Sequence, residues 1–110
     1  MTQKTKKKKT IYLSAPISGF DIDERRATFE RVENELKKLG YKVLSPMKNG
    51  LSQDEPTSHH MKRDIILLLQ ADAIFLMTGW NRSAGCLTEL HVATACGLDV
   101  WFEGISELKL

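Results

Sequence analysis

The chain has 110 residues, 42% of them hydrophobic, and a formal net charge of +2 at neutral pH. This length and apolar content suit one small globular domain with a modest core. The near-neutral charge argues against a broad nucleic-acid-binding surface, and no apolar stretch approaches the ~20 residues that a membrane-spanning helix requires.

Basic residues are concentrated at the start of the chain, where residues 1–9 contain five lysines. Without this run the remainder is slightly acidic. We predict a disordered, solubilising tail at residues 1–9 and a single domain at residues 10–110. The alternative is a tail that binds nucleic acid or serves in targeting.

The two cysteines, Cys86 and Cys96, lie on one predicted helix. At a rise of ~1.5 Å per residue they are ~15 Å apart, which is too far for a disulfide between them. Unpaired cysteines are typical of a reducing compartment, so we expect a cytoplasmic protein.

The first predicted elements are a strand and a helix. Residues 10–14 are rich in residues that favour strands. Asp21 is placed to cap a helix over residues 22–39, and Glu24, three positions later, would complete a capping box. Gly40 is a suitable stop for this helix. Its apolar stripe consists of Phe29, Val32, Leu36 and Leu39.

The next segment predicts a second strand at residues 41–45, followed by a loop at residues 47–57. This loop is longer than most connections in α/β domains, which indicates a functional lid or rim. Ser58 is predicted to cap a helix that continues to about residue 70, with Asp64 beside its apolar face. That face consists of Met61, Ile65, Leu68 and Leu69.

Residues 73–77 are entirely apolar and predict a strand in the centre of a sheet. A helix follows from about residue 84 to residue 96, and residues 99–102 form a fourth strand, whereas residues 103–110 are ambiguous. Strands that alternate with helices predict an α/β fold with right-handed crossovers. We therefore expect a small three-layer α/β/α domain of flavodoxin-like or Rossmann-like type, with a parallel sheet of about four to five strands.

The strongest functional signal is the strand, loop and helix that surround residues 78–97. The loop contains Gly79 and Gly85, and Glu89 lies early in the helix. Open α/β sheets bind ligands at the carboxyl ends of their strands. Because amides at a helix N-terminus favour negative charge, we expect Glu89 to stay ionised and able to act as a nucleophile.

Three further side chains are expected at the same edge of the sheet: Tyr12 in the first strand, Asp64 in the second helix, and Ser83. A carboxylate nucleophile, a second carboxylate and a tyrosine hydroxyl suit chemistry at a glycosidic bond. In its retaining form, one carboxylate attacks the anomeric carbon and forms a covalent glycosyl-enzyme.

Other ligand motifs are missing from the sequence. It contains neither the Gly-x-Gly-x-x-Gly pattern of dinucleotide-binding domains nor the Gly-Lys-Ser/Thr of a P-loop. His59 and His60 are adjacent and would point to different faces of a helix, and Glu89 and His91 are two positions apart. We predict no metal site and no organic cofactor.

The order of several motifs between residues 11 and 102 resembles that of the nucleoside 2-deoxyribosyltransferase superfamily. This superfamily includes the deoxynucleoside 5′-monophosphate N-glycosidases and small uncharacterised bacterial and phage relatives. The matching motifs are Ile-Tyr-Leu-Ser-Ala-Pro-Ile-Ser-Gly at residues 11–19, Arg63-Asp64, Gly79-Trp80, Ser83-Ala84-Gly85 and Glu89-Leu90.

The resemblance implies a role for individual residues. Glu89 takes the place of the family nucleophile, and Asp64 matches the acidic residue that orients the nucleophile or contacts the sugar and base. Tyr12 matches the tyrosine that forms a hydrogen bond near the nucleophile. Ser83 falls where the monophosphate-cleaving branch binds phosphate. The other residues that the resemblance implies in substrate binding are Ser14, Pro16, Ser18, Gly19, Gly79, Trp80 and Gly85.

Some positions depart from the family pattern or have a second interpretation. Pro16 stands where the monophosphate-cleaving branch has a serine, and His91 replaces the glycine that commonly follows the Glu-Leu pair. Asp64 could instead pair with a neighbouring cation or a loop amide. Trp80 could stack on a base, anchor its loop, or lie at an interface.

The resemblance implies hydrolysis or transfer at the N-glycosidic bond of a (deoxy)nucleoside or nucleotide. One alternative is a module that binds nucleotides without catalysis, for example a sensor. The other is glycosidic cleavage of an NAD-like dinucleotide. We expect a small-molecule substrate, no membrane or specific nucleic-acid partner, and assembly into a homodimer or higher homo-oligomer.

Overall fold

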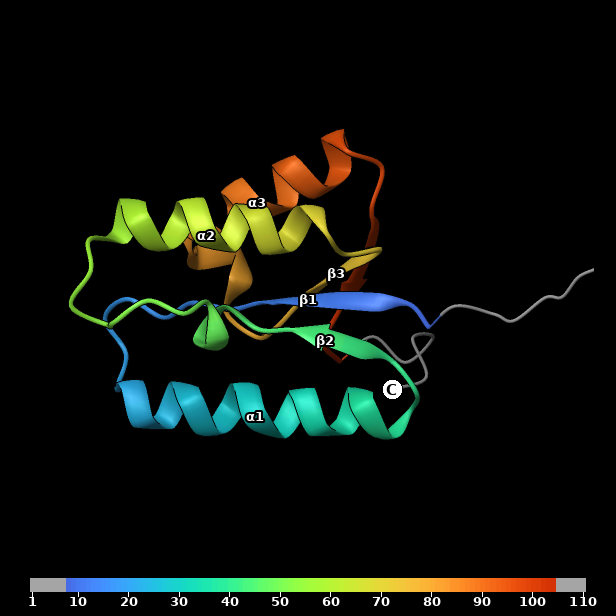
Figure 1. The fold of residues 1–110 in the computed structure, drawn as a ribbon, viewed down its shortest axis with the longest axis horizontal. Coiled ribbons are helices and arrows are strands. Elements are labelled where there is room, and N and C mark those ends of the chain that lie inside the picture. Colours follow the sequence, from blue (N-terminus) through green and yellow to red (C-terminus); the bar gives the residue numbers. More distant parts are fainter. Residues whose placement is uncertain (1–7, 105–110) are drawn as a thin grey trace, which may run out of the picture.

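The computed structural model describes residues 8–104, which form a parallel sheet of four strands with helices on both faces (Figure 1). The strands, in the spatial order β2-β1-β3-β4, are β1 (Thr10–Ser14), β2 (Lys42–Leu44), β3 (Ala73–Leu76) and β4 (Asp99–Phe102). The helices are α1 (Ile22–Lys38), α2 (Thr57–Leu69) and α3 (Ala84–Ala95). Because α1 covers one face of the sheet and α2 and α3 the other, the predicted three-layer α/β/α fold is confirmed.

Parts of the predicted terminal segments fall outside the described residues, namely residues 1–7 and 105–110. Lys9 belongs to the described part and contacts the sheet. Its carbonyl accepts a 2.9 Å hydrogen bond from the amide of Lys42, and its ammonium group lies 3.1 Å from a carboxylate oxygen of Asp99. Within residues 8–104, none of the helices is both long and apolar enough to cross a membrane.

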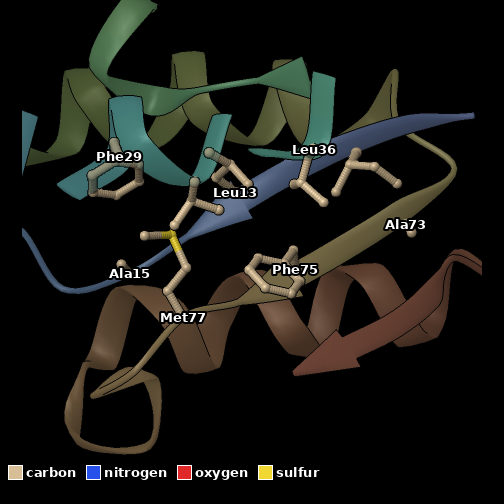
Figure 2. Close-up of a cluster of buried hydrophobic side chains, with 9 residues drawn as sticks. Leu13, Ala15, Phe29, Leu36, Ala73, Phe75 and Met77 are labelled. Carbon is tan, nitrogen blue, oxygen red and sulfur yellow. The ribbon is translucent and has the colours of Figure 1, made fainter. Parts of the chain in front are cut away.

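The first hydrophobic core lies between α1 and the sheet, where Figure 2 shows Leu13, Phe29 and Phe75 in one cluster. Side chains alternate between the two faces of a strand. Ile11 and Leu13 of β1 therefore point towards α1, whereas Tyr12 must point to the opposite face.

The second core lies between the sheet and the pair α2 and α3. Tyr12 joins Ile74 and Leu76 of β3 in this layer, and Leu68 of α2 and Ala93 of α3 cover them. Both central strands are buried on both faces, which explains the continuous apolar run of β3. The alternation of β1 therefore places Tyr12 and Ser14 beneath α2 and α3.

Helix α1 begins as predicted, because an Asp21 carboxylate oxygen accepts a 2.9 Å hydrogen bond from the amide of Glu24. The predicted capping box is only half formed, since the Glu24 carboxylate binds the guanidinium of Arg25 and the hydroxyl of Thr28 instead. Leu39 was predicted in the apolar stripe but is 49% exposed. It is the C-cap residue, where the backbone is leaving the helical path.

Helix α2 differs from the prediction at both ends. It begins at Thr57 after Pro56 and has no side-chain cap, so the prediction that Ser58 caps it is wrong. Pro56 already has the extended backbone of an N-cap residue and ends the loop one position earlier. Leu68 and Leu69 were both predicted on the apolar face of this helix. Only Leu68 faces the sheet, and Leu69 is 51% exposed.

The strand order creates a switch point between β1 and β3. The connection through α1 leads from β1 to β2 on one side, whereas the connection through α2 crosses β1 to reach β3 on the other. The loops after β1 and β3 therefore diverge at the carboxyl ends of these strands, where open α/β sheets bind ligands.

Candidate active site

The Glu89 carboxylate is held by two hydroxyl groups from the same strand. The phenol of Tyr12 donates to Oε2 at 2.8 Å, and the hydroxyl of Ser14 donates to Oε1 at 2.8 Å. Tyr12 and Ser14 are two positions apart on β1, so both face α3, and both are completely buried. Each oxygen of Glu89 is thereby fixed by a donor from one rigid element of the sheet.

Glu89 is 6% exposed, and its burial raises its pKa from 4.5 to about 7. The hydrogen bonds from Tyr12 and Ser14 oppose this effect, and the charge of Asp64 adds to it. The expectation that Glu89 stays fully ionised is therefore wrong near neutral pH. Glu89 is the sixth residue of α3, beyond the first turn, where the field of a helix terminus has largely faded.

The Tyr12 side chain remains protonated, as a phenol, near neutral pH. Its pKa is raised well above the usual value, first by burial and then by the charges of Glu89 and Asp64. A protonated hydroxyl can donate to a carboxylate, whereas a phenolate would repel it. Tyr12 therefore serves as a hydrogen-bond donor to Glu89.

Asp64 projects from α2 and is 8% exposed. Burial raises its pKa, while a hydrogen bond from Asn49 and the nearby His60 lower it. Nδ2 of Asn49 donates to Oδ1 of Asp64 at 2.9 Å. Of the interpretations left open by the sequence, the structure shows the contact with a loop amide group, here a side-chain amide.

A cleft of about 890 Å³ opens over these two carboxylates. Its walls are the loop after β1 with the start of α1, the segment from the 3₁₀ helix η1 (Pro46–Lys48) into the middle of α2, and the segment from residue 82 into α3. The residues predicted to bind substrate that line it are Pro16, Ser18, Gly19, Ser83 and Gly85, and both Asp64 and Glu89 reach it.

Tyr12, Ser14, Gly79 and Trp80 lie outside the cleft lining. Tyr12 and Ser14 lie behind Glu89 and reach the cleft only through its carboxylate. Trp80 begins the 3₁₀ helix η2 (Trp80–Arg82), and its ring lies against Phe102 with a centroid distance of 5.3 Å. Of the three interpretations of Trp80, this contact matches the loop anchor.

Gly79 and Ser83 shape the loop after β3. Gly79 has a φ of 93°, and a Cβ at this position would lie 3.1 Å from Cγ of Pro16, so the loops after β1 and β3 touch here. The hydroxyl oxygen of Ser83 accepts a 3.2 Å hydrogen bond from the amide of Cys86 and caps α3. The Ser83 side chain also lies within hydrogen-bonding reach of the Cys86 thiol.

Among residues 8–104, no group of three or more His, Cys, Asp or Glu side chains is arranged to hold a metal ion. The cysteines are free, with Cys86 buried in the cleft wall and Cys96 exposed. Burial raises the pKa of the Cys86 thiol, so this group is mainly protonated at neutral pH.

Residues 9–102 match the family model described as a domain of unknown function, DUF4406. The chain belongs to the DUF4406 family. No curated protein sequence matches it.

Solved structures similar to this DUF4406 chain include a 2-deoxyribosyltransferase from Leishmania mexicana, with a TM-score of 0.68 and 23% sequence identity over 86% of the chain. The chain spans 63% of the length of that protein. A 2-deoxyribosyltransferase from the psychrotolerant bacterium Bacillus psychrosaccharolyticus matches with a TM-score of 0.65 and 23% identity. This match covers 90% of the chain and 78% of that protein, which is described as a biocatalyst for nucleoside synthesis. The DUF4406 chain therefore has a nucleoside 2-deoxyribosyltransferase-like fold.

Four further residues in or beside the cleft were not indicated by sequence patterns. Asn49 and His60 contact each other beside Asp64, and Arg26 and Arg82 line the cleft. Asn49-Gly50 has the form of an ordinary turn. Arg26 lies in the amphipathic helix α1 and Arg82 in the 3₁₀ helix η2 of the connection after β3, and cations are common in both settings. Only the unusual length of the loop at residues 47–57 pointed towards this region.

Proposed function

We propose that the protein cleaves, or transfers the sugar at, the N-glycosidic bond of a (deoxy)nucleoside or nucleotide, with Glu89 as the nucleophile. The observation that carries this proposal is the Glu89 carboxylate in the cleft wall, with one hydroxyl donor on each oxygen. The 2-deoxyribosyltransferase-like fold supports the choice of substrate class.

The first step forms an ester between Glu89 and the sugar. An ionised Glu89 oxygen attacks C1′ as the bond from C1′ to the base nitrogen breaks, and the base leaves with the electron pair. Asp64 lines the same cleft, and burial favours its neutral form. Its carboxyl group is therefore suited to protonate the departing base.

The second step releases the sugar. Water, or a second base, attacks C1′ from the face that the first base left, and the Asp64 carboxylate accepts the proton of the attacking group. Glu89 departs as a carboxylate. The hydroxyl groups of Tyr12 and Ser14 stabilise the negative charge that returns to its oxygens.

Arginines and small hydroxyl side chains in the cleft lining support substrates that carry a 5′-phosphate. Arg26 and Arg82 line the cleft together with Ser18 and Ser83, and guanidinium and hydroxyl groups are suitable donors to phosphate oxygens. The proposal therefore includes both nucleosides and nucleoside monophosphates, and NAD belongs in the same test because it contains a bond of the same type.

Self-association also forms part of the proposal. Ile66 and Leu69 on α2 are 54% and 51% exposed, and Leu87 on α3 is 36% exposed. Large apolar side chains on adjacent helices favour burial against a second chain. Light scattering is expected to show a dimer or larger species at micromolar concentration, and a monomer would contradict this part.

The test is chromatography of a panel of nucleosides, nucleoside monophosphates and NAD after incubation with the protein. We expect release of free base from at least one member and loss of that release in Glu89→Gln. Glu30→Gln, on the exposed face of α1 outside the cleft, is expected to keep full activity. Binding without turnover across the panel would favour a non-catalytic module.

A further inference from the structure

Asn49 has an unusually complete set of partners for a loop residue. It lies between β2 and α2 and is 9% exposed. Its Nδ2 lies 2.9 Å from Oδ1 of Asp64 and 3.0 Å from Nδ1 of His60. Its Oδ1 accepts a 3.0 Å hydrogen bond from the amide of Leu51. Every polar atom of this side chain is therefore engaged.

These partners fix the orientation of the amide. An amide nitrogen only donates hydrogen bonds, so Nδ1 of His60 must be the acceptor. The proton of a neutral His60 then lies on Nε2, which is 3.1 Å from the carbonyl oxygen of Ser52. The flipped amide would direct its oxygen at the Asp64 carboxylate and its NH₂ at the amide of Leu51, and both contacts are unfavourable.

The fixed amide makes the two oxygens of Asp64 different. Oδ1 accepts from Asn49 and is therefore the poorer site for the carboxyl proton. Oδ2 of Asp64 differs from Oδ1, because among residues 8–104 no side chain or backbone group donates a hydrogen bond to it. Asp64 lines the cleft, so Oδ2 is the oxygen that remains for the proton and for a substrate.

We propose that Asn49 and His60 are positioning residues that determine which oxygen of Asp64 carries the proton exchanged with the substrate. Asn49 does so directly, and His60 does so by holding the amide of Asn49 in one orientation. The catalytic part of this inference rests on the proposed function. The part that concerns the protonation of Asp64 stands on the contacts alone.

The loop that carries Asn49 is itself anchored to α2. Nη1 of Arg63 donates a 3.1 Å hydrogen bond to the backbone carbonyl of Asn49. Gly50, with a φ of 86°, takes the left-handed turn beside Arg63 that few other residues adopt. The titratable groups around Asp64 are His60 on its own helix, Glu89 from α3 and Tyr12 from β1.

The experiment is a carbon-13 NMR titration of the aspartate carboxyl groups, without substrate, in the wild type and four variants. Asn49→Ala removes the donor to Oδ1, and the midpoint of Asp64 is expected to rise by about one pH unit. His60→Leu frees the side-chain amide of Asn49 and is expected to raise the Asp64 midpoint by less than Asn49→Ala does. His60→Asn offers an oxygen close to the position of Nδ1 but loses the imidazole whose charge lowers the pKa of Asp64, so it is expected to raise the midpoint less than His60→Leu does. Asn81→Ala, outside the cleft lining, is expected to leave the midpoint unchanged.

Steady-state base release in the same variants gives the second readout. Asn49→Ala is expected to lower kcat about 10- to 100-fold with less than about threefold change in KM, and His60→Asn to restore most of what His60→Leu loses. The inference is overturned if Asp64 titrates at the same pH in Asn49→Ala as in the wild type. It is equally overturned if His60→Asn is as impaired as His60→Leu.

The two readouts separate this inference from the proposed function. If Asn49→Ala raises the Asp64 midpoint but the wild type releases no base, the role of Asn49 is supported and the glycosidic activity is refuted. If the wild type releases base but the Asp64 midpoint is unchanged in Asn49→Ala, the glycosidic activity is supported and the role of Asn49 is refuted. If Asn49→Ala does not fold, as judged by circular dichroism, the pair His60→Leu and His60→Asn decides the question.

Discussion

The phenol of Tyr12 donates a 2.8 Å hydrogen bond to Oε2 of Glu89, although 77 positions separate the two residues in sequence. Both groups are buried, and the bond joins the central strand β1 to helix α3. Hydrogen bonds to a buried charged group contribute ~1.5–3 kcal/mol. This contact therefore fixes one oxygen of the proposed nucleophile and lowers the pKa of its carboxyl group, against the larger opposing effect of burial.

Removal of the phenol hydroxyl tests that relationship. In Tyr12→Phe, Glu89 loses one of the two donors that lower its pKa, so its pKa is expected to rise further. We expect the kcat for base release to fall about 10- to 100-fold, and Ser14→Ala to act in the same direction. The matched control is Tyr41→Phe, because Tyr41 lies edge-on to Trp101 on the other side of the sheet. Equal losses in both tyrosine variants would indicate a general packing effect.

The pH dependence of base release follows from the two carboxyl groups. The active form has a proton on Asp64 and a negative charge on Glu89, so the pair must hold one proton. Activity is expected to rise as the pair loses its first proton and to fall as it loses the second. Because the pKa of Glu89 is about 7 beside a charged Asp64, the fall is expected near pH 7.

Asp64→Asn supplies the control for this profile. Without a second carboxyl group, only Glu89 titrates, so the remaining activity should rise with pH to a plateau and show no fall. The midpoint should lie below 7, since the charge of Asp64 no longer raises the pKa of Glu89. A bell-shaped profile in Asp64→Asn would contradict the assignment of Asp64 as the proton donor.

The proposed nucleophile is expected to reduce stability. Its pKa is about 7 in the folded protein and 4.5 as a model group. The folded state therefore binds this proton more tightly, and stability falls as pH rises from 4.5 to 7. At about 1.4 kcal/mol for each tenfold change in acidity, the loss is about 3 kcal/mol. Thermal melts of Glu89→Gln should thus exceed the wild type by several degrees at pH 8 and match it near pH 4.

A second buried glutamate should behave in the opposite way. Although burial raises the pKa of Glu33, hydrogen bonds from Lys37 and Lys48 lower it overall. Its contribution to stability is present above the unfolded pKa and is lost as pH falls through the folded one. Glu33→Gln should therefore lower the melting temperature at pH 8, with a smaller difference in acid. Stabilisation by Glu33→Gln at pH 8 would refute this account of the two glutamates.

The contact between Gly79 and Pro16 predicts different effects for two glycine substitutions. Both Gly79 and Gly97 have positive φ angles, of 93° and 78°, so alanine at either is expected to destabilise the fold by ~1–2 kcal/mol. Only at Gly79 would the new Cβ press on a neighbour, 3.1 Å from Pro16 in the cleft wall. Gly79→Ala should therefore also raise KM for base release, whereas Gly97→Ala should leave KM unchanged.

The fold was predictable because its signals are local. The alternation of apolar strands with amphipathic helices predicted all four strands and all three α-helices of residues 8–104, and the parallel arrangement of the strands. Errors fell at element ends, as at Ser58 and Leu39, where one or two residues of displacement change whether a side chain caps a helix or faces solvent.

The site was only partly predictable, because its contacts join distant segments. The convergence of Tyr12, Asp64 and Glu89 followed from the rule that strand ends meet at one edge of a parallel sheet. The raised pKa of Glu89 did not follow from any sequence rule, since the extent of its burial depends on packing across three elements. Asn49 and His60 escaped notice because their importance comes only from each other and from Asp64.

The covalent intermediate is the central claim, and mass spectrometry of the intact protein and its peptides tests it most directly. Fluorine at C2′ of the sugar destabilises the oxocarbenium-like transition states of both steps, so with a base that leaves readily the ester should form and then be released only slowly. We expect one added sugar mass on the peptide that contains Glu89, and no such mass in Glu89→Gln. Base release by the wild type that leaves its mass unchanged throughout turnover would contradict nucleophilic attack by Glu89.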